Sequence, residues 1–145
     1  SAFTGVFGLA HRFESSLFVS AEYLYNGAGR EDAATAWSLL ADGHIQHASE
    51  HVTGLLVSYA LTLLLHVSLA TMVAIDDPSV LIQPGFVYSA ADEVDILAGA
   101  MLAFGERPAY RTTGASLSGL ASGTLGGSEF GTYPHVFYLE MKAYF

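Results

Sequence analysis

The last eleven residues of the chain alternate strictly in character, and this pattern constrains the fold more than any other feature. The odd positions from Phe137 to Phe145 are all apolar, whereas the even positions include Glu140 and Lys142. A β-strand places successive side chains on opposite faces and so separates the two sets, whereas a helix would mix them. The segment therefore predicts a strand with one apolar and one charged face.

The same period of two recurs along the chain, for example over residues 17–25, 65–75 and 94–104. Repeated alternation of this kind indicates successive half-buried strands. Pro84 cannot donate a backbone hydrogen bond, so it predicts a bulge or an irregular stretch within its strand. The sequence predicts seven strands, at residues 4–14, 15–27, 51–61, 63–76, 79–89, 93–105 and 135–145.

One segment permits a different interpretation. Residues 54–75 contain no Asp, Glu, Lys or Arg and are about as long as a membrane-spanning helix. Taken alone, this stretch fits a helix as well as it fits two strands. The alternation on its C-terminal side favours two strands that meet around residues 61–63.

The composition indicates which solvent the sheet faces. The chain is 52% hydrophobic and 13% charged, with a mean hydropathy of +0.41, whereas soluble domains carry about 25% charged residues. A soluble β-sandwich or lipocalin-like barrel would also alternate, but its outward faces would need charge. Lipid around the apolar face explains the pattern more simply.

The connections between the predicted strands alternate in length. Residues 26–50 and 106–134 form long loops, while the turns at residues 14–16, 61–63 and 90–92 are tight. Transmembrane barrels have short periplasmic turns and longer outer loops, which predicts a periplasmic C-terminus. We therefore expect residues 1–145 to form one all-β domain, an antiparallel up-and-down transmembrane β-barrel.

Two details bear on whether this barrel is complete. Seven is an odd number, whereas bacterial single-chain barrels have even strand counts. Either one strand is uncounted or, as we expect, the chain is the C-terminal portion of a larger barrel. Residues 1–10 lack the basic and apolar regions of a signal peptide, so we expect a mature or trimmed product.

The C-terminal segment resembles the terminal strand of bacterial outer-membrane proteins, in which a final Phe follows apolar residues at every second position. Phe137, Leu139, Met141 and Phe145 match this signature, while Ala143 stands where an aromatic residue is common. Residues 54–105 are similar to the C-terminal half of porin-like proteins. The resemblance implies a bacterial outer-membrane location and recognition by the barrel-assembly machinery, and it implies no catalytic residues.

The strand pattern also assigns candidate sites. Ionisable side chains in a membrane segment need water or partners, so they are expected to face the lumen. Aromatic rings near strand ends suit the lipid–water interface and form girdles. The lumen candidates are Arg12, Glu22, His66, Glu93, Asp95, Glu140 and Lys142; the girdle candidates are Tyr23, Tyr25, Tyr59, Phe86, Tyr88, Phe104 and Phe137.

Several function classes are disfavoured. A net charge of −9 leaves no basic patch for nucleic acid, and the absence of Cys excludes thiolate sites. The sequence has no G-x-S-x-G nucleophile motif or Gly-rich phosphate loop, so we predict neither an enzyme nor a cofactor. His44, His47 and His51 have helical spacing and are a weak metal-site candidate, with solvated histidines as the default.

We therefore expect a porin-like channel for small solutes or ions in the outer membrane, with an acidic excess that suggests a mild preference for cations. The alternative is a structural barrel that encloses or anchors a partner, such as a periplasmic or electron-carrying protein. A barrel enzyme or an adhesin is less favoured. Small residues expected in the lumen would suit close packing against such a partner: Ala70, Ala74, Gly99 and Ala103.

Overall fold

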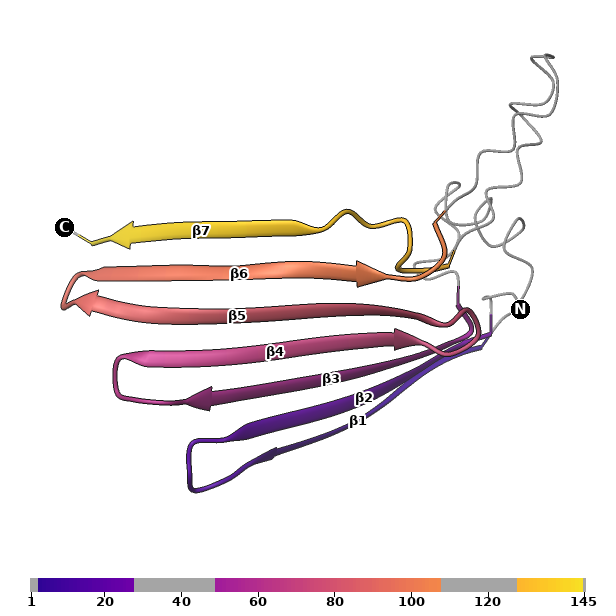
Figure 1. Ribbon diagram of the computed structural model, residues 1–145. Coiled ribbons are helices and arrows are strands. Elements are labelled where there is room, and N and C mark those ends of the chain that lie inside the picture. Colours follow the sequence, from indigo (N-terminus) through magenta and orange to yellow (C-terminus); the bar gives the residue numbers. More distant parts are fainter. Residues whose placement is uncertain (1–2, 28–48, 108–127, 145) are drawn as a thin grey trace, which may run out of the picture.

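A computed structural model describes residues 3–27, 49–107 and 128–144, which form one antiparallel sheet (Figure 1). Each strand pairs with its neighbours in sequence, so the sheet is an up-and-down meander. This confirms the all-β, antiparallel prediction, and the predicted strand ends differ by three residues or fewer. The seven strands are β1 (Thr4–Arg12), β2 (Phe18–Asn26), β3 (His51–Ala60), β4 (Leu65–Ala74), β5 (Ser79–Ala91), β6 (Val94–Phe104) and β7 (Val136–Ala143).

The long apolar segment at residues 54–75 forms β3, a tight turn and β4, so the helical interpretation is wrong. The turn residue Thr62 stabilises the reversal, because its Oγ1 accepts hydrogen bonds from the backbone N–H of Leu64 (3.2 Å) and Leu65 (3.0 Å). In the part of the chain that the structure describes, no helix has the length and apolar character needed to cross a membrane.

The two ends of the sheet differ in their connections (Figure 1). The turns β1–β2, β3–β4 and β5–β6 lie at one end, together with the C-terminal end of β7; we call this the turn end. The strand ends that lead into residues 28–48 and 108–127 lie at the other, which we call the loop end. In the β1–β2 turn, Ser16 has φ 66° and its N–H donates to the Phe13 carbonyl at 3.2 Å, as in three-residue hairpins.

Pro84 interrupts the pairing of β5 with β6 without shifting it. Ile82 pairs with Leu102 and Gly85 pairs with Gly99, which is the same register on both sides of the proline. Pro84 has no N–H to donate, so the ladder is irregular at this point, as the sequence predicts. The register shift lies instead near the turn end, between Ser89 and Ala91.

Gly99 lies in β6, where the Tyr138 side chain of β7 and the Pro84 backbone of β5 approach it closely. A Cβ at this position would lie 2.6 Å from Cζ of Tyr138 and 2.7 Å from the carbonyl oxygen of Pro84. The Tyr138 hydroxyl also lies near Gly85, so one ring from β7 covers glycines of both β6 and β5. An aromatic side chain over strand glycines compensates for the packing surface that they lack.

The described core is small and lies at the loop end of one face. Val52, Ala74, Leu81 and Ala103 come from four different strands and surround Phe130, which is 2% exposed. Phe130 belongs to the segment that precedes β7, which folds back against the sheet. Elsewhere the large apolar side chains of the strands are mostly half-exposed or exposed.

The described sheet is open. β1 pairs only with β2 and β7 pairs only with β6, and no Cα of β1 lies within 8 Å of β7. The two edge strands lie at opposite sides of the sheet in Figure 1.

Candidate functional site

The register divides the strand residues into two faces, because directly paired residues point to the same side of a sheet. One face can be traced across all seven strands through consecutive pairs. These pairs are Arg12–Phe18, Phe18–Ser58, Ser58–Ser68, Ser68–Gly85, Gly85–Gly99 and Gly99–Tyr138. We call this the polar face, and the opposite side the apolar face.

The polar face carries every Asp, Glu, Lys and Arg side chain within the seven described strands. These are Arg12, Glu22, Asp95, Glu140 and Lys142. His66 lies on the same face, where it pairs with Ala60 and Val87. Glu93 lies in the β5–β6 turn and not on a strand, although its carbonyl accepts a hydrogen bond from Tyr144 N–H at 2.9 Å.

The charges of β6 and β7 form the one local group among these lumen candidates. Lys142 is the direct cross-strand partner of Asp95, and its Nζ lies 3.7 Å from Oε1 of Glu140. Asp95 also accepts a hydrogen bond from the Ser89 hydroxyl at 2.8 Å. The group holds two carboxylates and one ammonium on a half-exposed surface, which suits contact with water and dissolved ions.

The other polar-face candidates lie apart from this group. The Arg12 guanidinium lies 5.4 Å from the Phe18 ring centroid, a cation–π contact across the β1–β2 pair. Glu22 pairs with Gly8, and its Cγ occupies the space beside that glycine. These residues therefore line a surface that extends over the sheet, and they do not converge on one catalytic centre.

The structure describes only one of the three histidines of the metal-site candidate. His44 and His47 lie outside them, so only His51 is placed, on the apolar face at the loop end. Its Nδ1 shares a 2.6 Å hydrogen bond with the Tyr23 hydroxyl, and its backbone N–H donates to Asp76 at 2.7 Å. Among the described residues, no group of three or more His, Cys, Asp or Glu could hold a metal ion.

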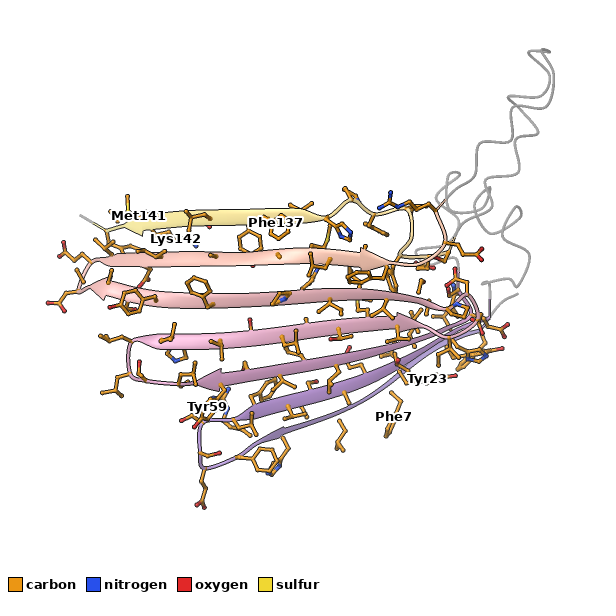
Figure 2. All side chains as sticks on the ribbon, in the orientation of Figure 1. Phe7, Tyr23, Tyr59, Phe137, Met141 and Lys142 are labelled. Atoms are coloured by element: carbon orange, nitrogen blue, oxygen red, sulfur yellow. The ribbon has the colours of Figure 1, made fainter. Side chains whose placement is uncertain are left out.

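The apolar face carries all the girdle candidates. Tyr23, Tyr25 and Phe104 lie near the loop end, while Tyr59, Phe86 and Tyr88 lie near the turn end. Phe137 is the second residue of β7 and is 75% exposed (Figure 2). Leu139 and Met141 follow it on the same face, whereas Phe145 of the terminal signature lies outside the described residues.

A segment that the sequence analysis did not single out covers the loop end of the polar face. We call Ser128–Gly131 the capping segment. Phe130 N–H donates to Ser79 Oγ at 3.2 Å, and Glu129 N–H donates to Asp77. The buried Glu129 carboxylate accepts a 2.8 Å hydrogen bond from Ser49 N–H. The capping segment is therefore bound to the β4–β5 turn and to the residues just before β3.

Burial raises the pKa of Asp77, and the nearby Glu129 carboxylate acts in the same direction. Hydrogen bonds from Glu129 N–H and from the Ser79 hydroxyl oppose the rise by stabilising the charged form. Asp77 is thus a carboxylate whose ionisation is coupled to docking of the capping segment.

The capping segment also changes the interpretation of the small polar-face residues. Ala74 and Ala103 pack against Phe130, and Gly99 is covered by Tyr138. Phe130 and Tyr138 of this chain therefore occupy the space beside these three residues. Ala70 pairs with Leu56 and Gln83 and is half-buried. The sequence offered one signal for this packing, the single Phe in a Gly- and Ser-rich stretch.

No family model, curated protein or solved structure matches the chain.

Proposed function

We propose that this chain is part of a bacterial outer-membrane β-barrel whose apolar face contacts lipid and whose polar face lines the lumen. One observation carries the proposal: all five strand charges lie on one face, while large apolar side chains stand exposed on the other. In water, such an apolar surface would be an aggregation hazard or an interface. In a bilayer it is the surface that a transmembrane barrel requires.

The composition of the turn end supports the same environment. Leu61, Leu63 and Leu64 occupy the β3–β4 turn, and Leu63 is 97% exposed. Apolar turn residues at the end of the sheet that also carries Tyr59 and Tyr88 suit the boundary between acyl chains and water. With short turns on the periplasmic side, the C-terminus is periplasmic and the capping segment lies on the outer side.

The function that we propose is a porin-like channel for small solutes or ions, without catalysis. Glu22, Asp95 and Glu140 outnumber the two basic strand residues of the polar face, Arg12 and Lys142. A lumen with an acidic excess favours cations modestly, since rings of carboxylates select them in other pores.

Single-cysteine labelling tests the membrane arrangement, because the chain has no native cysteine. Ser68→Cys and Leu69→Cys alter adjacent residues of β4 that lie on opposite faces. In reconstituted liposomes, a water-soluble maleimide should react with the Ser68→Cys variant, and a bimane attached to the Leu69→Cys variant should be quenched by brominated lipid. Equal labelling and equal quenching of the two variants would contradict the proposal.

Planar-bilayer recording then tests the channel itself. The expected result is a conductance that becomes more cation-selective in Lys142→Glu, because this change replaces a lumen ammonium with a carboxylate. Leu139→Ala, on the apolar face, is the matched control and should leave ion selectivity unchanged.

One observation favours a second candidate, a closed structural barrel. The capping segment fills the loop end of the polar face with its own Phe130. A barrel whose lumen is plugged in this way would give no conductance in bilayer recording, while its β4 cysteine variants would still give the alternating labelling pattern.

A further inference from the structure

The strands at the two edges of the sheet lack a neighbour on one side. In β1 and β7, alternate residues direct their backbone N–H and C=O groups to the single neighbouring strand, and the remaining residues direct theirs outward along the described edge. Within lipid, each unpaired group costs several kcal/mol, so neither edge can remain bare. The inference therefore rests on the proposed membrane location.

The directions of the two edge strands restrict what can pair with them. β1 and β7 both run from the loop end to the turn end, because an even number of reversals separates them in the meander. An antiparallel neighbour of either strand must run from the turn end to the loop end. A purely antiparallel closure therefore needs an odd number of further strands between β7 and β1.

A second copy of this chain does not meet that requirement. If two copies were inserted in the same orientation, β7 of one would meet β1 of the other, and these strands run the same way. Both seams would then be parallel, in a sheet whose six described pairings are all antiparallel. A copy inverted in the membrane would place its loop end on the opposite side.

The exposed side chains at the edges indicate the chemistry of the missing strands. On the apolar face, Phe7 and Leu9 of β1 are 74% and 72% exposed, whereas Leu55 and Leu69 of the inner strands are 44% and 42% exposed. The extra exposed area of Phe7 and Leu9 lies on the side of β1 that has no neighbouring strand, whereas an inner strand has a neighbour on both sides. On the polar face, the charged side chains of β7 are also half-exposed: Glu140 is 56% and Lys142 is 45% exposed.

We propose that an odd number of β-strands with a sequence different from this chain completes the sheet and pairs antiparallel with both β7 and β1. The strand beside each edge runs from the turn end to the loop end. It carries apolar residues on the lipid side and confines its polar residues to the side of Glu140 and Lys142.

Disulfide trapping in the full-length protein, in membranes of the cells that produce it, tests this arrangement. Val6→Cys and Ala10→Cys of β1 would each be combined with Val136→Cys and Glu140→Cys of β7, all on the polar face. With a strand in between, the two Cα atoms lie about 10 Å apart or more, beyond the reach of a disulfide of about 7 Å. All four pairs should stay reduced under mild oxidation.

The positive control is Leu97→Cys with Glu140→Cys, which are direct partners on β6 and β7 and should form a disulfide under the same conditions. An intramolecular disulfide between β1 and β7 would show that the seven strands close on themselves. An intermolecular disulfide would show that a second copy closes them. Either result would overturn the proposal.

Hydrogen exchange on the same membranes supplies the positive readout. The amides of β1 and β7 should be protected to the level of β4 amides, because strands cover both edges. Rapid exchange at alternate edge amides would overturn the proposal even with all cysteine pairs reduced. The alternating labelling of β4 depends on the membrane location alone, so it separates failure of this inference from failure of the proposed function.

Discussion

The two faces of the sheet share one backbone, yet their side chains are packed in opposite ways. On the polar face, Phe130 is 2% exposed among apolar residues of four strands, and Tyr138 covers Gly99. On the apolar face, Phe7 is 74% exposed and Phe137 is 75% exposed. The chain therefore supplies its own covering for part of the polar face and leaves the larger apolar surface to its surroundings.

The comparison shows where the stability of the fold has to come from. Burying apolar surface stabilises a protein by about 25 cal/mol per Å², and the described core is only a small cluster. The exposed apolar side chains can contribute only when lipid or detergent covers them. We therefore expect the polar face to respond to packing changes and the apolar face to respond to charge.

The largest effect is expected at Phe130. Phe130→Ala removes the centre of the described core and should lower the free energy of unfolding by about 3–5 kcal/mol in detergent. Urea denaturation followed by near-UV circular dichroism measures it. Phe7→Ala, an equal truncation on the apolar face, should cost less, because detergent fills the space that the ring leaves and no cavity forms. Equal losses of unfolding free energy in the two variants would contradict the proposed difference in packing between the faces.

Charge should reverse this order of sensitivity. Leu69→Lys places an ammonium in the middle of the apolar face, where lipid contact would cost about 2–4 kcal/mol. Ser68→Lys places the same group one residue away on the polar face, where water would hydrate it. Refolding yield into liposomes, read from heat-dependent gel mobility, should fall for Leu69→Lys and stay near the wild-type value for Ser68→Lys. Equal yields would mean that lipid does not contact the apolar face.

The strands could be predicted from the sequence because alternation is a local property. A residue in β7 shows its face through its immediate neighbours, as Met141 and Lys142 do, and no distant contact is needed. The same locality resolved the apolar stretch at residues 54–75 into β3 and β4.

The capping segment could not be predicted for the opposite reason. Its hydrogen bonds connect Glu129 to Asp77, 52 residues away, and to Ser49, 80 residues away. Asp77 and Ser79 have the composition of an ordinary turn, and nothing nearby in the sequence indicates a long-range partner. Whether the sheet closes could not be predicted either, because an edge strand and an inner strand show the same alternation of apolar and polar residues.

A smaller effect is expected at the polar-face glycines, and it tests how closely this face is packed. Gly99→Ala would push against the Tyr138 ring and the Pro84 backbone, so it should destabilise the protein by about 1–3 kcal/mol. Gly54→Ala is the matched control on β3, because its Cβ would meet nothing within 4 Å. It should be neutral or stabilise by up to about 1 kcal/mol. Equal denaturation midpoints would show that Tyr138 does not rest on Gly99.

The smallest effect is expected from pH, and it again separates the capped polar face from the rest of the sheet. The pKa of Asp77 is raised in the folded protein, chiefly by burial, so the folded state holds this proton more tightly than the unfolded state does. Stability should therefore increase as pH falls through the folded pKa towards the ordinary value of 3.8, and the gain should stop below it.

Asp77→Asn tests this linkage, because it removes the titration while it keeps one side-chain oxygen to accept from Glu129 N–H. Limited proteolysis next to the capping segment should slow on mild acidification in the wild-type protein, when compared at equal protease activity. The variant should lose that part of the pH dependence, whereas Asp92→Asn, at the turn end, should retain it. A wild-type segment that loosens on acidification would show that the hydrogen bonds to ionised Asp77 outweigh the cost of its burial.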